Sequence, residues 1–396
     1  MSQTDLHIRL IETTDQLVTF CKSAQTAPFL TVDTEFMREK TYFPQLCLVQ
    51  VGTETEAVVV DALAPGIELQ PLWDLLLNTP MPKVFHAASQ DLEIFARLAG
   101  ALPAPLFDTQ IAAMVVGIGD QVGYDKLVKE TLGVSIDKSS RYSDWSVRPL
   151  AKRQIDYAAG DVTYLRGVYR KLVGLLEQQD RGAWVDEEMA KIAVLSKYQN
   201  DPAQAYKRLK VRTDKAKFMA ILQQLASWRE LDAQNRDVPR GRIMRDDTLL
   251  DLASAEPTTV EDLKKIRGVS DKLAAGKIGK EIIRAVNLGL ATPRDQIVVT
   301  KRRPALTDEE TAKLSLLKML LSVKAAEAGT AARMLASSQD LEELARTPLD
   351  LWHEKDVPCL NGWRKGLYGD AAQALVQGKL WIGFENGSVQ VRESSQ

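Results

Sequence analysis

Two acidic residues interrupt an apolar segment near the amino terminus, in a pattern that could hold a cation. In the stretch PFLTVDTEF, residues 28–36, Asp33 and Glu35 stand two positions apart in an expected strand. Side chains at positions i and i+2 of a strand point to the same face. Two carboxylates held that close repel each other unless a cation lies between them. Taken alone, the motif leaves an edge strand with a solvated polar face as an open alternative.

Three further polar residues come from later segments. Asp91 falls in the first turn of an expected helix, where the helix dipole stabilises a carboxylate whatever its function. Tyr157 and Asp161, in the stretch YAAGDVTYL, are four residues apart on an expected helix and therefore share a face. Such a pair is also common on helix surfaces. Only as a set do the four carboxylates and the tyrosine indicate one site.

The chemistry of this set is that of hard oxygen ligands. Carboxylates without histidine or thiolate favour Mg²⁺ or Mn²⁺ over zinc. Two such ions about 4 Å apart are a common arrangement for phosphodiester hydrolysis, in which one activates a water and the other stabilises the leaving oxygen. Tyr157 would orient the water, because a phenol with a pKa of about 10 is a poor base. The sequence therefore predicts two divalent ions held by Asp33, Glu35, Asp91 and Asp161.

The elements expected to position these residues are strands followed by helices. Short segments rich in Val and Leu predict four strands, at 28–36, 45–52, 57–62 and 83–88. The first three follow one another closely, which favours an antiparallel meander because parallel neighbours need a long crossover. Apolar spacing predicts helices at 90–99, 108–117, 124–132, 151–178 and 184–197. This order favours an α/β nuclease fold over a doubly wound nucleotide-binding fold, and the sequence has no Gly-rich phosphate-binding motif.

Length and composition are those of a multidomain globular protein. With 396 residues, 45% of them hydrophobic and 26% charged, the chain is expected to form two or three domains. The net charge of −2 divides unevenly: residues 1–200 have 19 basic against 26 acidic side chains, and residues 201–396 have 32 against 27. This division fits a cation-binding catalytic part joined to parts that bind a polyanion.

Several classes of protein are disfavoured by the same sequence. Cys21, Cys47 and Cys359 are far apart and form no CxxC motif, which argues against a disulfide framework and against structural zinc. The amino terminus lacks the charged and apolar pattern of a signal peptide. No apolar stretch approaches the roughly 18–20 residues needed to cross a bilayer. The sequence therefore predicts a cytoplasmic protein with no membrane contact.

Beyond residue 200 the expected elements are nearly all helical. A helical region at 214–290 is followed by a Pro- and charge-rich linker at 291–307 and by a second helical region at 308–384. The two helical regions have similar lengths, which indicates an internal duplication.

Basic residues in this half are candidates for contacts to a nucleic-acid backbone. They are concentrated in the segment 197–217, and Arg240, Arg242 and Arg245 follow it. The basic run at 301–303 is interpreted as a solvated part of the linker.

Four motifs in order, TVDTEF, HAASQDLEIF, SDWSVRPL and YAAGDVTYL, resemble the tyrosine-containing branch of the DEDD exonucleases and, within it, the ribonuclease D family. The resemblance implies a ribonuclease H-like α/β exonuclease domain with a mixed sheet. The catalytic and metal-holding residues that it implies are Asp33, Glu35, Asp91, Tyr157 and Asp161. Many members of the superfamily carry Asn four residues before the second-motif Asp, where this chain has Ala87.

The carboxy-terminal half resembles a second known module. Residues 214–290, around VPRGRIMRDDTLLDLASAEPTTVEDLKKIRGV, are similar to the helicase-and-ribonuclease-D C-terminal (HRDC) domain, and residues 308–384 look like a degenerate copy. The expected architecture is an exonuclease domain at 1–200 followed by two all-α HRDC bundles at 210–292 and 305–385.

The resemblance to the ribonuclease D family also implies a pocket for the terminal nucleotide. Positions that flank the motif acids line this pocket in such folds, with an apolar side chain against the last bases. In this chain those positions are Phe36, Met37, Ser89 and Gln90.

Other residues near the motifs have two explanations each. His86 could touch substrate or metal, or be a partly buried strand histidine. Trp145 and Arg148 could contact the RNA end or pack against a helix. Asp61 and Asp108 are left outside the metal set, because the first ends an expected strand and the second caps an expected helix.

The expected function is hydrolysis of RNA from a single-stranded 3′ end by two Mg²⁺ or Mn²⁺ ions, with release of nucleoside 5′-monophosphates. The resemblance implies tRNA precursors as partners, whose 3′ trailers are trimmed by a monomeric enzyme. One alternative is a 3′→5′ DNA exonuclease, because only contacts to the 2′-OH separate RNA from DNA. A non-catalytic nucleic-acid-binding scaffold is the other, and the intact set of four acids and a tyrosine argues against it.

Overall fold

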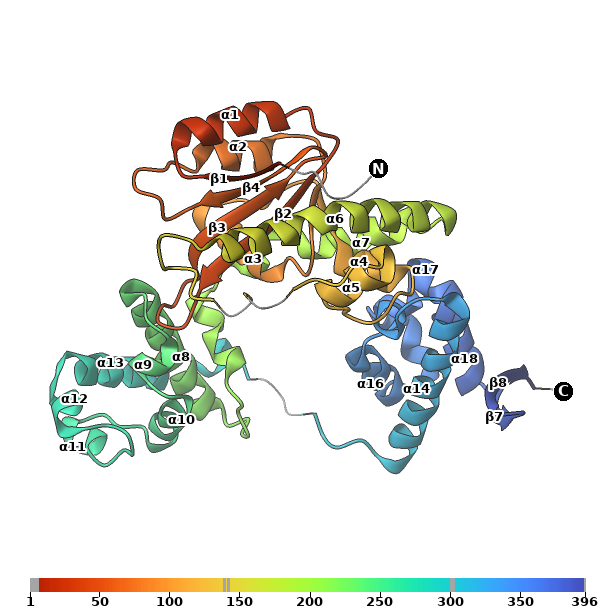
Figure 1. The fold of residues 1–396 in the computed structure, drawn as a ribbon. Helices are drawn as coiled ribbons and strands as arrows, with labels where there is room; N and C mark the ends of the chain where they lie inside the picture. Colours follow the sequence, from red (N-terminus) through yellow and green to blue (C-terminus); the bar gives the residue numbers. More distant parts are fainter. Residues whose placement is uncertain (1–6, 138–139, 141–142, 300–302, 395–396) are drawn as a thin grey trace.

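The computed structural model describes residues 7–137, 140, 143–299 and 303–394. An amino-terminal α/β domain lies above two helical bundles in the view of Figure 1. Residues 301 and 302 of the basic linker lie outside the described residues, so the interpretation of that run remains a prediction. Within the described ranges, no helix combines the length and apolar character that a membrane span requires.

A six-stranded mixed sheet forms the centre of the amino-terminal domain, with the strand order β1-β4-β3-β2-β5-β6. The strands are β1 (His7–Ile11), β2 (Leu30–Met37), β3 (Gln45–Gly52), β4 (Glu56–Asp61), β5 (Lys83–Phe85) and β6 (Leu106–Asp108). β2, β3 and β4 form the antiparallel meander that the sequence predicts. β5 runs parallel to β2, which brings the end of β5 beside the acidic motif.

The two edge strands have no counterpart among the expected ones. β1 pairs in parallel with β4, and β6 pairs in parallel with β5. β6 has only three residues, too few to show the alternation that identifies a strand. β1 is largely exposed and buries only Ile11 fully. Pairing with distant segments, rather than local pattern, makes both segments strands.

Helices cover both faces of this sheet. On one face, α1 (Thr14–Ala24), α2 (Gln70–Asn78) and α3 (Ser89–Leu98) enclose the larger apolar core. On the other face, α6 (Lys152–Gln178) packs small residues, Ala158 and Ala159, against the sheet. The domain is completed by α4 (Thr109–Val115), α5 (Tyr124–Leu132) and α7 (Gly182–Ile192). Helices α3 to α6 lie where the apolar spacing predicts them, whereas α7 ends before the expected residue 197 and α1 and α2 were not expected.

Gly52, at the end of β3, lets α6 approach the sheet closely. The Thr31 hydroxyl beside it donates a 2.8 Å hydrogen bond to the carbonyl oxygen of Val162 in α6. A Cβ on Gly52 would overlap the Thr31 hydroxyl and lie 3.2 Å from that same carbonyl oxygen. This close approach fixes the distance of α6 from β2. Asp161, the residue before Val162, is therefore held close to the sheet.

The first helical bundle comprises six helices around its own apolar core. They are α8 (Ala216–Arg236), α9 (Arg240–Ile243), α10 (Asp246–Ala255), α11 (Val260–Leu263), α12 (Asp271–Ala275) and α13 (Lys277–Ala291). The second bundle has a separate core. Its α-helices are α14 (Asp308–Ala328), α15 (Ala332–Leu335), α16 (Ser338–Arg346), α17 (Gly362–Arg364) and α18 (Asp370–Val376).

The two bundles begin with the same order of elements. Each starts with a helix of 21 residues, α8 or α14, which ends at a residue with positive φ, Asp237 or Gly329. A four-residue helix follows in each, and then a helix of ten residues in α10 and nine in α16. This parallel supports the predicted duplication, and the second copy itself stays a prediction.

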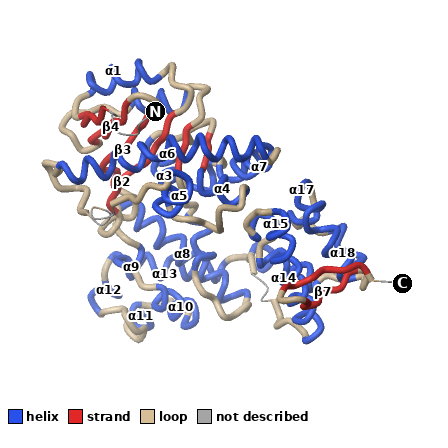
Figure 2. Tube along the Cα trace, turned by 45° about the vertical axis from the view of Figure 1, so that its right-hand side comes forward, coloured by secondary structure: helices blue, strands red, loops and turns tan. Residues whose placement is uncertain are grey.

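Contrary to the expectation, the carboxy-terminal region is not entirely helical. A hairpin of β7 (Leu380–Glu385) and β8 (Ser388–Glu393) follows α18, and Figure 2 shows it as strand beside the second bundle. Its Leu380, Ile382 and Val391 pack against the core of that bundle. The all-α prediction for residues 305–385 is wrong at this end, because alternating residues here bury one face against α14 and α18.

The second bundle docks on α7 of the amino-terminal domain. The Arg364 guanidinium, which is buried, donates to Glu187 at 2.5 Å and also to Glu188. Trp363 stacks on Trp184 with ring centroids 4.1 Å apart. A buried arginine paired with two carboxylates and a stacked aromatic pair hold this interface in one arrangement.

Substitution of Gly52 tests the seat of α6. Gly52→Ala should lower the free energy of unfolding by about 1–3 kcal/mol, because the added methyl must displace Thr31 or the helix backbone. Gly174→Ala, in α6 itself, is the matched control, since a Cβ there meets nothing within 4 Å. Its free energy of unfolding should rise by about 0.5–1 kcal/mol. Urea unfolding of both variants measures the difference, and equal effects would contradict the close seat of α6.

Candidate active site

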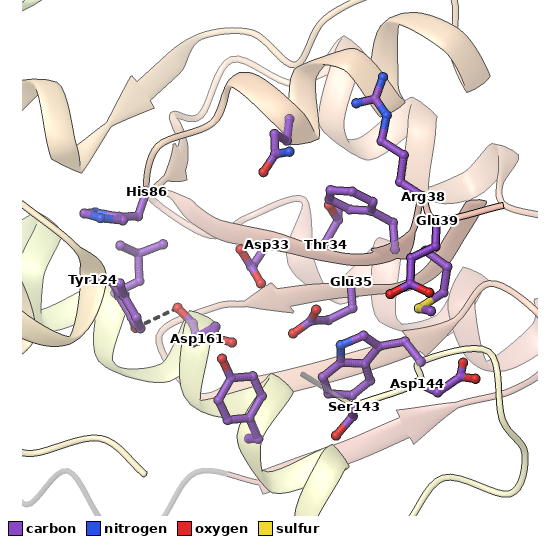
Figure 3. Close-up of a pocket in the computed structure, with 16 residues that line it drawn as sticks. Asp33, Thr34, Glu35, Arg38, Glu39, His86, Tyr124, Ser143, Asp144 and Asp161 are labelled. Atoms are coloured by element: carbon purple, nitrogen blue, oxygen red, sulfur yellow. Dashed lines mark hydrogen bonds between the residues drawn. The ribbon is translucent and has the colours of Figure 1, made fainter. Parts of the chain in front are cut away.

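One pocket gathers most of the residues that the motifs single out. It has a volume of about 550 Å³ and lies between the end of β2, the starts of α3 and α5, one face of α6 and the segment 143–145 (Figure 3). Its lining residues are Asp33, Thr34, Glu35, Phe36, Met37, Arg38, Glu39, His86, Gln90, Tyr124, Ser143, Asp144, Trp145, Tyr157, Asp161 and Leu165.

Three carboxylates meet in this pocket. Asp33 and Glu35 come from β2 and Asp161 from α6, and Figure 3 shows them directed toward a common space. One oxygen atom from each lies within 4.8 Å of the other two. The predicted convergence of the first and third motifs is therefore present in the geometry. It arises because α6 is seated over the face of β2 on which positions 33 and 35 point.

Burial and mutual repulsion make this cluster costly to ionise. Burial, and then the charges of Asp161 and Asp91, raise the pKa of Glu35 to about 9. Burial raises the pKa of Asp161 to about 7. Burial and the same neighbouring charges, together with Glu35, hold the pKa of Asp33 well above its usual range. A cation in the cluster would favour the ionised forms and relieve this cost.

Asp91, the fourth expected ligand, lies beside the cluster of three and not within it. It is 7% exposed in the first turn of α3, and its carboxylate accepts a hydrogen bond from the Thr34 hydroxyl. Burial raises the pKa of Asp91 to about 7. Its charge still reaches the pocket, since it raises the pKa of both Asp33 and Glu35. Thr34 thus connects the second motif to the strand that carries the first.

Two tyrosines face the cluster, and only one was expected. Tyr157 lines the pocket one turn before Asp161, with its ring centroid 6.1 Å from that of Trp145. Tyr124, at the start of α5, donates from its hydroxyl to the carbonyl oxygen of Asp161 at 2.7 Å (Figure 3). Burial and the charges of Asp161 and Asp33 hold the pKa of Tyr124 well above its usual range. No motif in the sequence identifies Tyr124 as a site residue, because an aromatic residue at the start of a helix commonly packs into a hydrophobic core.

The expected substrate contacts divide into residues inside and outside the pocket. Phe36, Met37, Gln90 and Trp145 line it, together with His86. Ser89 does not, and instead lines a different cavity between the amino-terminal domain and the second bundle.

Arg148 is engaged elsewhere. It is not among the pocket residues, and its Nε and Nη2 atoms donate to the two carboxylate oxygens of Asp61, each at 2.5 Å. Its Nη1 atom donates to the carbonyl oxygen of Trp145 at 2.7 Å. All donor positions of Arg148 are used in hydrogen bonds to Asp61 and to backbone carbonyl oxygens, which disfavours the expected contact with the RNA end. The same pair explains why Asp61 stands outside the metal set.

The environment of His86 also favours the packing alternative. Its Nδ1 atom lies 3.0 Å from the Thr109 hydroxyl, and that hydroxyl donates to the carbonyl oxygen of Phe85. The buried Nε2 atom has no hydrogen-bond partner among the described residues. Burial lowers the pKa of His86, so the ring is a neutral part of the pocket wall beside Tyr124.

Asp108 organises the turn that carries the second motif. Its carboxylate accepts from the backbone N–H of Ala87 at 3.1 Å, of Ala88 at 2.9 Å and of Gln110 at 2.8 Å. The last bond is the predicted cap of α4. Ala87 has a φ of 57°, a conformation that costs energy for a residue with a Cβ and that Asn adopts more readily. The two bonds to Asp108 offset this cost.

The loop between β2 and β3 forms one wall of the pocket and then leaves the domain. Arg38 lines the pocket and makes two hydrogen bonds of 2.7 Å to Glu93 of α3. A few residues later, the Asp237 carboxylate of the first bundle accepts from the backbone N–H groups of Tyr42 and Phe43, both at 3.0 Å. The first bundle therefore fixes the end of the β2–β3 loop that lies away from the pocket, at Tyr42 and Phe43.

The Tyr42 side chain is the centre of this contact. It is 3% exposed, donates to Glu230, and accepts from Arg240 at 2.8 Å and from Gln234 at 3.2 Å. Arg240 also donates to Glu230 and covers the Tyr42 ring at 4.6 Å. The expectation that Arg240 contacts phosphate is therefore not supported, because its guanidinium is used at the domain interface. The adjacent aromatic residues in the short loop TYFPQ are the sequence feature that could have indicated this contact between domains.

Comparison with known proteins agrees with the motifs. Residues 8–177 match the 3′-5′ exonuclease family model, and residues 218–286 match the HRDC domain model. Ribonuclease D of Gluconacetobacter diazotrophicus is 45% identical over 380 residues, which cover 96% of this chain and 95% of the relative. The chain belongs to the ribonuclease D family. Ribonuclease D of Jannaschia sp. is likewise 45% identical over 388 residues, covering 97% and 99% of the two chains.

The solved ribonuclease D structure of Escherichia coli has the same fold. It aligns with a TM-score of 0.77 and 29% identity over 94% of this chain and 99% of its own. That protein is described as an exoribonuclease involved in structured RNA processing. A protein from Bifidobacterium adolescentis, at 20% identity and a TM-score of 0.67, supports the fold alone. As a member of the ribonuclease D family, the present chain is a 3′→5′ exoribonuclease with an HRDC domain.

Stability should depend on pH through the acidic cluster. The pKa of Glu35 is raised from 4.5 to about 9, so this group imposes no ionisation penalty on the folded state below pH 4.5, and relative stability is lost as pH rises from there toward 9. In the presence of a chelator, Glu35→Gln should therefore melt higher than the unmodified protein near pH 8 and equally near pH 4. Thermal melts from pH 4 to 9 measure this. Glu39→Gln, at an exposed position of the same pocket, is the control and should change the melting temperature little.

The Tyr42 contact should contribute to stability. Tyr42→Phe removes the hydroxyl shared by Glu230, Gln234 and Arg240 and should cost about 1–3 kcal/mol, because three hydrogen bonds are lost from a buried polar network. Urea unfolding monitors the change, and proteolysis of the loop 38–44 should accelerate. Tyr169→Phe on α6, whose ring packs against Phe29 and Phe107, is the matched control. Unchanged proteolysis in Tyr42→Phe would contradict the role of the first bundle in fixing this loop.

Proposed function

We propose that this exoribonuclease removes nucleotides one at a time from a single-stranded RNA 3′ end by two-metal-ion hydrolysis, releasing nucleoside 5′-monophosphates. The observation that carries this proposal is the approach of Asp33, Glu35 and Asp161 to within 4.8 Å of one another in a pocket of nucleotide size. Like charges brought this close in a buried site require compensation, and the substrate, a phosphodiester, adds a further negative charge.

The residues present fit divalent ions of the magnesium type. The donor set consists of carboxylates alone, which favours Mg²⁺ or Mn²⁺ over softer metals. Asp33, Glu35 and Asp161 would hold the ions, with Asp91 directly beside them. When bound, such ions would neutralise charge on the scissile phosphate and make a water molecule more acidic. We propose two ions, as the phosphodiester chemistry favours, and assign no preference between the two metals.

The chain's own side chains would position the reactants. The Tyr157 hydroxyl would orient the attacking water from one turn before Asp161, while Tyr124 holds the backbone of that same turn. Phe36, Met37 and Trp145 supply an apolar wall against which the terminal base can pack. Gln90 offers a hydrogen-bonding amide at the start of α3. These roles follow from the position of each side chain in the pocket.

We further propose that the natural substrates are tRNA precursors with 3′ trailers, on which the enzyme acts as a cytoplasmic monomer. The first helical bundle would hold the upstream RNA. Basic side chains of the segment 197–217 are exposed, in agreement with contacts to phosphate, and those of Arg242 and Arg245 are exposed as well. These residues surround the bundle that also fixes the loop at the pocket wall, so RNA binding there would place the 3′ end near the carboxylates.

Hydrolysis of defined oligomers tests the catalytic assignment. With Mg²⁺ and a 5′-labelled RNA, Asp33→Asn should reduce the rate by about two to three orders of magnitude, since it removes one preorganised charge from the site. Asp144→Asn, the same change at the rim of the same pocket, is the matched control and should reduce the rate only a few-fold. Equal activity of Asp33→Asn and the unmodified protein would remove the assignment.

The same assay separates RNA from DNA. A matched DNA oligomer should be degraded more slowly than the RNA, and equal rates would favour the alternative of a general 3′→5′ exonuclease. Membership of the ribonuclease D family answers the other alternative, a non-catalytic scaffold.

A further inference from the structure

Gln50 of β3 is a buried amide with an unexplained environment. Its side chain is fully buried, and neither Oε1 nor Nε2 has a hydrogen-bond partner within the described part of the chain. A buried amide that makes no hydrogen bond destabilises a fold, and an apolar side chain of the same size would pack there at lower cost. Such a group in a native protein calls for a role outside packing.

The strand register places Gln50 next to the acidic cluster. It is directly opposite Asp33 in the antiparallel pair of β2 and β3, and the next pair on the same face joins Leu48 to Glu35. Side chains of directly opposed residues point to one face, with Cβ atoms about 4.5–5.5 Å apart. Gln50 therefore lies on the face that carries both strand carboxylates of the pocket.

α6 encloses this amide from above. Gly52, two residues further along β3, is where the carbonyl oxygen of Val162 comes closest to the sheet. The other direct neighbour of Gln50 across the sheet is Val59 of β4, which is apolar. The amide is thus confined between an apolar strand, a helix whose backbone is already hydrogen-bonded, and Asp33. Of the two residues that face Gln50 across the sheet, Asp33 is the one that carries a side-chain acceptor.

We propose that Gln50 is a positioning residue for the metal site, donating from Nε2 to the Asp33 carboxylate when the cluster holds its divalent ions. This inference rests on the proposed function. A metal-bound carboxylate is ionised, and an amide N–H donates a stronger hydrogen bond to an ionised carboxylate than to a neutral acceptor. A neutral donor also suits this place better than Lys or Arg, because it orients the ligand without repelling the cations. In the metal-free state the Gln50 amide then lacks this hydrogen bond, which destabilises the fold, and the bond forms when metal binds.

The test compares stability with metal affinity in one variant. Gln50→Met has a similar volume and removes the amide. Its melting temperature in a chelator should equal or exceed that of the unmodified protein, while its affinity for Mn²⁺, measured by calorimetry without RNA, should fall about 10–100-fold, as is typical for the loss of a group that orients a ligand. Thr163→Val removes another buried, unpartnered polar atom from the neighbouring helix. It should leave Mn²⁺ affinity unchanged.

Each outcome decides between the two proposals. If the unmodified protein binds no Mn²⁺, or if Asp33→Asn binds it equally well, the proposed metal site fails and the role of Gln50 fails with it. If the metal site holds but Gln50→Met binds Mn²⁺ with unchanged affinity, the role of Gln50 alone is overturned. If Gln50→Met and Gln50→Leu both fail to fold, the amide is needed by the fold itself, which also overturns the proposal.

Discussion

Repulsion among three carboxylates is the constraint on which the rest of this structure depends. Asp33, Glu35 and Asp161 are held within 4.8 Å of one another, and their raised pKa values show that the fold opposes their ionisation. Nothing in the local sequence of either element favours that approach. The packing of the domain must therefore keep β2 and α6 together. A bound divalent ion would relieve part of the repulsion between the carboxylates.

The tight seat of α6 on the sheet meets this demand. The absence of a side chain at Gly52 and the hydrogen bond from Thr31 to Val162 bring the helix onto the strands one residue from Asp161. Tyr124 fastens the same turn from the other side. Buried polar contacts here are short and mutually supporting, so the site is held by the rigid part of the domain, whereas the pocket wall formed by the loop 38–44 depends on a second domain.

That dependence gives the helical bundles a structural role besides any contact with RNA. The first bundle holds Tyr42 and the adjoining backbone through Glu230, Arg240 and Asp237, and the second grips α7 through Arg364. Charged residues that looked available for phosphate, Arg240 above all, are used in these interfaces. Other lysines and arginines of the first bundle, Arg242 and Arg245 among them, are exposed.

The sequence by itself determined the meander, most of the helices around the motifs, the three motif carboxylates that meet, and the family. Short-range periodicity carries that information, because side chains two apart on a strand or four apart on a helix share a face whatever the rest of the chain does. Only the tertiary structure decided that β1 and β6 are strands, that Asp91 contacts Thr34, and that Arg148 and Arg240 are used by Asp61 and Glu230. It also decided that Gln50 lies opposite Asp33 without a hydrogen-bond partner among the described residues. Most of those outcomes depend on a partner that is distant in the sequence or on burial by α6. Even Arg240 and Glu230, ten residues apart, meet only because two helices pack together, and no local pattern encodes such a pairing.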